Sequence, residues 1–207
     1  MQTDDAHNRL LASKVLVELA GRNINGSYAQ TKEAALEAIL DMVPVESTAS
    51  FAGSQTLRDI GLREALRAHG CTLWDPDDGK TGAEKDEIAH RALAADVYFT
   101  SVNAIALTGE LVTADGYGNR AASLIFGPRR VIIVVGVNKI VPTVETAIQR
   151  TRIYAAQRTV MLFKQDYPSY DELARVAETA CSHLVITERS ATKDRMSLVL
   201  VGERLGF

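Results

Sequence analysis

The stretch from Ser101 to Arg120 holds more side chains capable of chemistry than any other part of the chain. Asn103 can both donate and accept hydrogen bonds, and Arg120 can hold an oxyanion with a fixed fork of donors. Glu110 and Asp115 are potential bases or nucleophiles. The same pattern also fits a hairpin and a turn, because Asp-Gly is common turn chemistry and asparagine is a common helix N-cap. If the stretch forms a site, three more of its residues are candidate ligand-binding residues: Gly116, Gly118 and Asn119.

A second group of polar residues is the run Gly53, Ser54, Gln55 and Thr56, between an expected strand and an expected helix. The glycine permits close backbone approach, the hydroxyls can donate, and the first amides of a helix lie at its positive end. These features suit a phosphate or a carboxylate. Alternatively, Thr56 and Asp59 have capping-box spacing, in which case the run merely begins a helix.

Asn138 and Lys139 closely follow the apolar run Val131–Val135. In an open α/β sheet, ligands bind beyond the carboxyl ends of the strands. A lysine at that place can neutralise a bound anion or a developing negative charge, although a solvated lysine after a strand is also common. We therefore count Asn138 as a candidate ligand-binding residue, and Lys139 as a candidate catalytic residue together with Glu110 and Asp115.

Motifs of several enzyme classes are absent from the sequence. The histidines show no metal-ligand spacing; they are His7, His69, His90 and His183. The sequence contains no G-x-S-x-G, no G-x-x-x-x-G-K-[ST], and no G-x-G-x-x-G after the first expected strand. We therefore expect no metal and no cofactor, and disfavour a serine hydrolase, a P-loop NTPase and a dinucleotide-binding dehydrogenase.

Alternating strand and helix patterns must position these groups. Short apolar runs predict strands at Ser50–Ala52, Cys71–Trp74, Val97–Thr100, Val131–Val135, His183–Ile186 and Leu198–Val201. Helical spacing predicts helices at about 6–20, 31–42, 57–68, 83–94, 119–126, 143–155 and 170–181. The alternation predicts an α/β fold with a doubly wound, mainly parallel sheet. Ile105–Leu107 and Glu110–Ala114 predict an inserted β-hairpin, and N-terminal helices precede the sheet.

Composition limits the classes of partner. The 207 residues include 23 basic and 26 acidic side chains, a balance that does not predict a nucleic-acid-binding surface. The longest strongly apolar stretch, Val131–Val137, is too short for a bilayer core of about 30 Å, and the polar N-terminus does not resemble a secretory signal. Cys71 and Cys181 are too few for a disulfide framework and predict buried thiols in a reducing compartment. We expect a cytoplasmic protein with no nucleic-acid or membrane partner.

Several blocks, in this order, give the chain a resemblance to the LUD-domain, or lactate-utilisation, family. They are Gly53–Leu57, Ser101–Ala104, Gly109–Val112, Asp115–Arg120, Phe126–Pro128, Val135–Lys139 and Val201–Phe207. The blocks span most of the chain, and the long run from Ser101 to Lys139 makes the resemblance specific. We predict a single LUD domain over residues 1–207, with residues 1–43 forming a helical N-terminal arm packed on it.

The resemblance implies the fold shared by ribose-5-phosphate isomerase, glucosamine-6-phosphate deaminase and the CoA-transferases. It also implies a link to bacterial oxidation of lactate to pyruvate, alongside iron–sulfur and flavin-linked partner proteins. Relatives often carry several cysteines between the helix after Lys139 and the C-terminal strand, where this chain has only Cys181. The family offers no agreed catalytic residues, so the candidate site comes from residue chemistry at the matched motifs.

Three functions fit the sequence. The first is an accessory component of lactate oxidation that binds a small anion, a carboxylate or a phosphate, or a partner subunit. The second is an enzyme acting on a phosphorylated sugar or an acyl-CoA, with Ser54 and Thr56 holding the phosphate and Lys139 stabilising negative charge. The third is an assembly protein whose amphipathic N-terminal helix, around Leu11, docks a partner or a second copy in a homo-oligomer.

Overall fold

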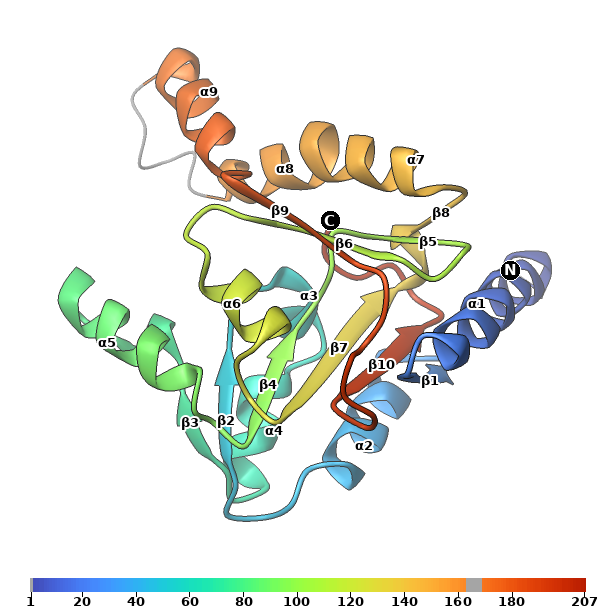
Figure 1. The fold of residues 1–207 in the computed structure, drawn as a ribbon, viewed down its shortest axis with the longest axis horizontal. Coiled ribbons are helices and arrows are strands. Elements are labelled where there is room, and N and C mark those ends of the chain that lie inside the picture. Colours follow the sequence, from blue (N-terminus) through green and yellow to red (C-terminus); the bar gives the residue numbers. More distant parts are fainter. Residues whose placement is uncertain (1, 163–168) are drawn as a thin grey trace.

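Six parallel strands form the central sheet of the computed structural model, which describes residues 2–162 and 169–207 (Figure 1). The strands, in spatial order, are β1 (Ile24–Ala29), β10 (Met196–Val201), β7 (Arg130–Gly136), β4 (Val97–Thr100), β2 (Thr48–Phe51) and β3 (Thr72–Trp74). All five pairings are parallel. The predicted α/β fold with a mainly parallel sheet is therefore confirmed.

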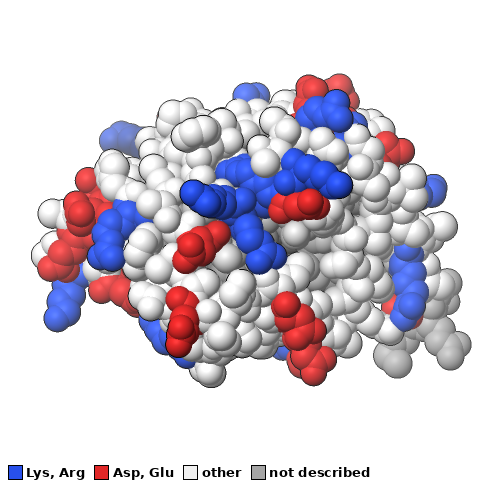
Figure 2. All heavy atoms as spheres, turned by 60° about the horizontal axis from the view of Figure 1, so that its bottom comes forward, with Lys and Arg blue, Asp and Glu red and all other residues white. Residues whose placement is uncertain are grey.

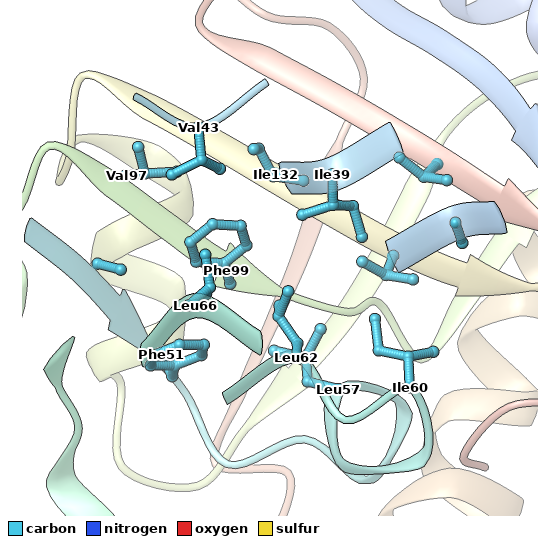
Figure 3. Packing of buried hydrophobic residues seen from close by; sticks show 14 of the residues in the cluster. Ile39, Val43, Phe51, Leu57, Ile60, Leu62, Leu66, Val97, Phe99 and Ile132 are labelled. Carbon is cyan, nitrogen blue, oxygen red and sulfur yellow. The ribbon is translucent and has the colours of Figure 1, made fainter. Parts of the chain in front are cut away.

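The sheet is covered on both faces, which explains the uninterrupted apolar sequence of β7. Ile132 and Val134 belong to one core cluster, whereas Val131, Ile133 and Val135 belong to another. Successive side chains of a strand point to opposite faces, so a strand buried on both sides must be apolar throughout. Figure 3 shows the first cluster, in which the stacked rings of Phe51 and Phe99 lie among aliphatic side chains.

Helices from different parts of the chain complete these two clusters. Helices α2 (Lys32–Asp41), α3 (Gln55–Asp59) and α4 (Leu62–Ala68) contribute to the first. Helices α1 (Gln2–Gly21) and α6 (Asn119–Ile125) contribute to the second, and α5 (Gly82–Ala92) packs beside β2 and β3. The buried residues of α1 are Ala12, Val15 and Leu19, so its apolar stripe packs within the chain, whereas Leu10 and Val17 are exposed.

A second, smaller sheet lies beyond the carboxyl ends of the central strands (Figure 1). Its order is β8 (Ile140–Val141), β5 (Ala104–Ala106), β6 (Leu111–Asp115) and β9 (His183–Thr187). The antiparallel pair β5–β6 is the predicted hairpin. Helices α7 (Val144–Gln149), α8 (Ala156–Met161) and α9 (Tyr170–Thr179) lie on the outer side of this sheet, and a π-helix, Arg150–Ala155, joins α7 to α8.

Among the residues that the structure describes, two single-turn 3₁₀ helices lie in the loops. The first, Pro76–Asp78, follows β3, and the second, Val137–Lys139, follows β7. The second turn links the centre of the main sheet to β8 of the smaller sheet. It therefore holds Asn138 and Lys139 between the two sheets.

The structure departs from the sequence expectations at five places. Residues 1–43 are not wholly helical, because β1 lies among them and pairs with β10 at the sheet edge. The strand near His183 joins the hairpin rather than the central sheet. The expected helix 57–68 is divided at Gly61, which has a positive φ of 66°. Cys181 is half-buried rather than buried, and helical structure continues past residue 155 to Met161.

Both signs of charge occur on the face of the molecule shown in Figure 2. Basic side chains gather near its middle, with acidic side chains beside and around them. Among residues 2–162 and 169–207, none of the helices combines the length and the apolar character that crossing a membrane requires.

Candidate functional site

A pocket of about 130 Å³ lies at the carboxyl end of the central strands, where the smaller sheet adjoins them. We call it the Lys139 pocket. The turns after β2, β4 and β7 supply much of its lining, because parallel strands that end at one edge bring their following loops together. Residues that are far apart in the chain thus meet here. Seven of the residues singled out from the sequence line it: Gly53, Ser54, Gln55, Thr56, Asn103, Arg120 and Lys139.

The Lys139 side chain lines this pocket and is almost fully buried. Its Nζ donates to Thr56 Oγ1 at 2.8 Å, to Ser101 Oγ at 2.9 Å and to the Val102 carbonyl at 3.1 Å. All three acceptors are formally neutral. Lys139 therefore joins the start of α3 to the end of β4 through neutral groups.

Burial lowers the pKa of Lys139 to about 7. The guanidinium groups of Arg150 and Arg120 act in the same direction, whereas the carboxylate of Asp59 opposes them. Removing a charge from water disfavours the charged form, and neighbouring charges of the same sign add to that effect. Near neutral pH the side chain is thus balanced between ammonium and amine. An anion in the pocket would favour the ammonium.

Arg120 and Asn103 supply further donors to the pocket. Arg120 Nη2 donates to the Gly53 carbonyl at 2.7 Å, while its buried Nε has no hydrogen-bond partner among the described residues. Asn103 Oδ1 accepts from the Ala114 amide at 2.8 Å, so its Nδ2 group is the part of the side chain left to donate. Both residues therefore present donors that suit an oxyanion.

The run Gly53–Thr56 begins α3 and also lines the Lys139 pocket. Ser54, rather than Thr56, is the N-cap of α3, and its Oγ accepts from the Leu57 amide at 3.4 Å. Thr56 instead accepts from Lys139. Asp59 does not form the capping box; it accepts from the Gln55 side chain and from the Gly206 amide.

Gly206, next to the pocket-lining Phe207, lies against Thr56 and Lys139 and needs to be a glycine. Its φ is +56°, and an added Cβ would lie 2.5 Å from Thr56 Oγ1 and 3.4 Å from Lys139 Nζ. A side chain there would be strained by the backbone conformation and would also displace the Thr56 hydroxyl.

Asp115 shapes the turn before α6 instead of presenting a free carboxylate. Its Oδ1 accepts from the Tyr117 amide and its Oδ2 from the Ala121 amide, at 3.1 and 2.9 Å. Gly118, with a φ of 98°, is the N-cap of α6, so Asn119 is the first helical residue rather than the cap. Asp115 and Gly116 line a neighbouring pocket, whereas Gly118 and Asn119 line neither.

The structure does not bring Glu110 or Asn138 into the pocket. Glu110 lies at the hairpin and pairs with Arg22, beside the end of α1. Burial tends to raise the pKa of Glu110, but hydrogen bonds from Thr108 and Arg22 outweigh it and hold the pKa below its ordinary value. Asn138 binds both backbone groups of Leu205 and so fixes the C-terminal segment. Both residues have structural roles here.

Sequence reasoning missed several residues of the site. Arg150 donates to the carbonyls of Asn103 and Asn138 and lies close enough to affect Lys139. It begins the π-helix, an irregularity often found at functional sites. Ser101 could have been predicted as a site residue, because it directly follows a predicted strand. The other residues of the lining that were missed are Arg58, Asp77, Val102, Thr159, Leu162 and Phe207.

Metal binding is not indicated by the described part of the chain, where no group of three or more His, Cys, Asp or Glu side chains could hold an ion. The pocket instead combines Lys139, Arg120 and Arg58 with the Asp77 carboxylate, which is paired with Arg58 at 3.0 Å. Such an arrangement can hold an anion by charge and by hydrogen bonds. The geometry defines an α/β protein with a cationic pocket at the carboxyl edge of its parallel sheet.

Comparisons with known proteins identify the family. The model of the LUD domain matches residues 13–201, so the chain belongs to the LUD-domain family, which is associated with lactate utilisation. A crystal structure of a DUF162-family protein from Deinococcus radiodurans is similar, with a TM-score of 0.53 and 13% identity. The match covers 95% of this chain and 98% of that chain and supports the fold. A search of curated proteins gave no match.

Proposed function

We propose that the chain binds a small organic carboxylate in the Lys139 pocket and acts as an accessory component of bacterial lactate oxidation to pyruvate, together with partner subunits. The observation that carries the proposal is the buried Lys139 amine, which has three neutral acceptors and two guanidinium groups nearby. Neither Lys139 nor Arg120 forms a salt bridge with a described residue. A bound carboxylate would supply a counter-charge beside both side chains.

The size of the pocket favours a small ligand. Its volume of about 130 Å³ lies below the range of about 300–1,000 Å³ that is typical of sites for drug-sized molecules. A three-carbon acid offers one carboxylate for Arg120, close to the charge of Lys139, and one oxygen for the Asn103 amide. The family association with lactate utilisation supports the same class of ligand.

A second candidate is an enzyme acting on a phosphorylated sugar or an acyl-CoA. It is favoured by the Lys139 amine, which has a pKa of about 7 and lies within 2.9 Å of two hydroxyl groups, those of Thr56 and Ser101. An amine with such a pKa could accept a proton from a hydroxyl near neutral pH. Of the other two bases considered from the sequence, Glu110 lies elsewhere and both oxygens of Asp115 accept backbone amides.

The test is ligand binding by the full chain, measured by calorimetry and thermal unfolding with lactate, pyruvate, a sugar phosphate and CoA. We expect lactate or pyruvate to bind, and Lys139→Met and Arg120→Gln to weaken binding at least about tenfold, because each removes a charge from the pocket. Ligand at a hundred times its Kd stabilises a protein by about 2.7 kcal/mol, which a thermal shift detects.

Two exposed residues provide matched controls, Lys193→Met and Arg129→Gln. These remove the same charges from the surface and should leave the Kd unchanged. Binding of the phosphorylated compounds alone would support the enzyme instead. Failure of every carboxylate to bind, or equal weakening by the control variants, would overturn the proposal.

A further inference from the structure

A second chamber adjoins the Lys139 pocket and shares three of its residues, Asn103, Arg120 and Thr159. We call it the outer chamber. Its volume of about 500 Å³ is within the range typical of small-molecule sites, whereas that of the Lys139 pocket is below it. The two spaces therefore meet where Arg120 and Asn103 present their donors.

The walls of the outer chamber differ in character from those of the Lys139 pocket. Tyr117, whose side chain is largely exposed, contributes an aromatic ring. Apolar walls favour methylene groups over water. Small and aliphatic side chains from β6, α8 and the α9 region form much of the lining: Ala114, Ala156, Val160, Val176 and Ala180.

We propose that the preferred ligand is a monocarboxylate with an apolar tail of several carbons, its carboxylate in the Lys139 pocket and its tail in the outer chamber. The inference rests on the proposed function, because both concern the same site. It goes further in assigning a chain longer than that of lactate. The shared residues Arg120 and Asn103 would bind the carboxylate and the neighbouring oxygen of the ligand where the two spaces meet, and the carbons beyond would enter the outer chamber.

Asp115 gives the outer chamber a preference for an uncharged tail. Asp115 is among the residues that line this chamber, and both of its carboxylate oxygens already accept backbone amides. A second carboxylate at the far end of the ligand would therefore meet a like charge, which disfavours a dicarboxylate.

The experiment measures the Kd of the full chain for 2-hydroxy acids of increasing length, from lactate to 2-hydroxyhexanoate, and for a dicarboxylate of matched length. Burial of each methylene group should tighten binding about fourfold. Over the three added groups, the Kd should fall about sixtyfold. The dicarboxylate should bind more weakly than the monocarboxylate.

Ala180→Phe places a phenyl ring in the outer chamber and so reduces the space for a tail. Ala122→Phe, at an exposed position of α6 outside both pockets, is the matched control. Ala180→Phe should remove the gain from chain length and leave the Kd for lactate unchanged, whereas Ala122→Phe should change neither. If Ala180→Phe does not fold, Val160→Ala tests the same point, because losing two methyl groups from the lining should weaken binding of the long acid more than that of lactate.

The outcomes separate the two proposals. Equal affinity for short and long acids, a gain that survives Ala180→Phe, or a dicarboxylate that binds as tightly as the monocarboxylate overturns the outer-chamber proposal and leaves the proposed function standing. If no carboxylate of any length binds, both fail.

Discussion

Replacing Lys139 with methionine should change how the stability of the protein depends on pH. Burial lowers the pKa of Lys139 from 10.5 to about 7. Between these values the unfolded chain binds more protons than the folded chain, so the free energy of unfolding rises with pH. Below pH 7 both states are protonated and this contribution is constant.

The expected size follows from the proton balance. One proton contributes about 1.4 kcal/mol per pH unit, so stability should rise by up to about 4 kcal/mol from pH 7 to pH 10. Lys139→Met removes this rise. It also removes the donor to Thr56 and Val102, which costs about 1–3 kcal/mol at every pH. At pH 6, however, the variant is free of the cost of burying an ammonium, which the same proton balance puts at about 5 kcal/mol and which exceeds the loss of the donor. The variant should therefore be less stable than the wild type at pH 10 and no less stable at pH 6.

The assay is urea unfolding at pH 6 to 10 for the wild type, Lys139→Met and the control Lys193→Met. The control should keep the wild-type rise, because Lys193 is exposed. Burial also raises the pKa of Tyr98, but that change affects stability only above about pH 10. Parallel pH profiles for the wild type and Lys139→Met would refute the reasoning.

Three further predictions concern residues around the site. Glu110→Gln should lower the free energy of unfolding by about 1 kcal/mol and leave the Kd for the carboxylate unchanged, because it weakens the pair with Arg22; a large loss of binding would place Glu110 in the site. Asp115→Asn should cost about 1–2 kcal/mol in denaturant unfolding, since the carboxylate accepts an amide of the first turn of α6; an unchanged midpoint would contradict that role. Gly206→Ala should weaken carboxylate binding in calorimetry, because its methyl group would displace Thr56 Oγ1; an unchanged Kd would show that the Thr56 hydroxyl is not needed.

The sequence predicted the fold best where a strand is buried along its whole length. The apolar run of β7 predicted a strand covered on both faces, and alternating patterns predicted the parallel sheet. Strand β1 was missed because Ile24–Ala29 contains Asn25, Gly26 and Ser27, which mark turns more often than strands. Its pairing with β10 overrides that local preference.

The candidate site could be predicted in part. Lys139, Thr56 and Arg120 stand shortly after strands or at the starts of helices, and such positions are visible in a sequence. Arg150 was not predictable, because its place depends on a π-helix and on contacts across the fold. Glu110 was singled out by residue type, but its partner Arg22 lies 88 positions away in the chain.

The most direct test of the central claim is the number of protons taken up when lactate binds. This number is measured at about pH 8 by calorimetry in two buffers that differ in ionisation enthalpy. A lysine with a pKa of about 7 is mostly neutral at that pH. A bound carboxylate should raise its pKa, so that the amine takes up a proton from the buffer. We predict an uptake of about 0.9 proton per lactate in the wild type and much less in Lys139→Met. Binding without proton uptake, or with equal uptake in the variant, would contradict the assignment of Lys139 as the anion-binding group.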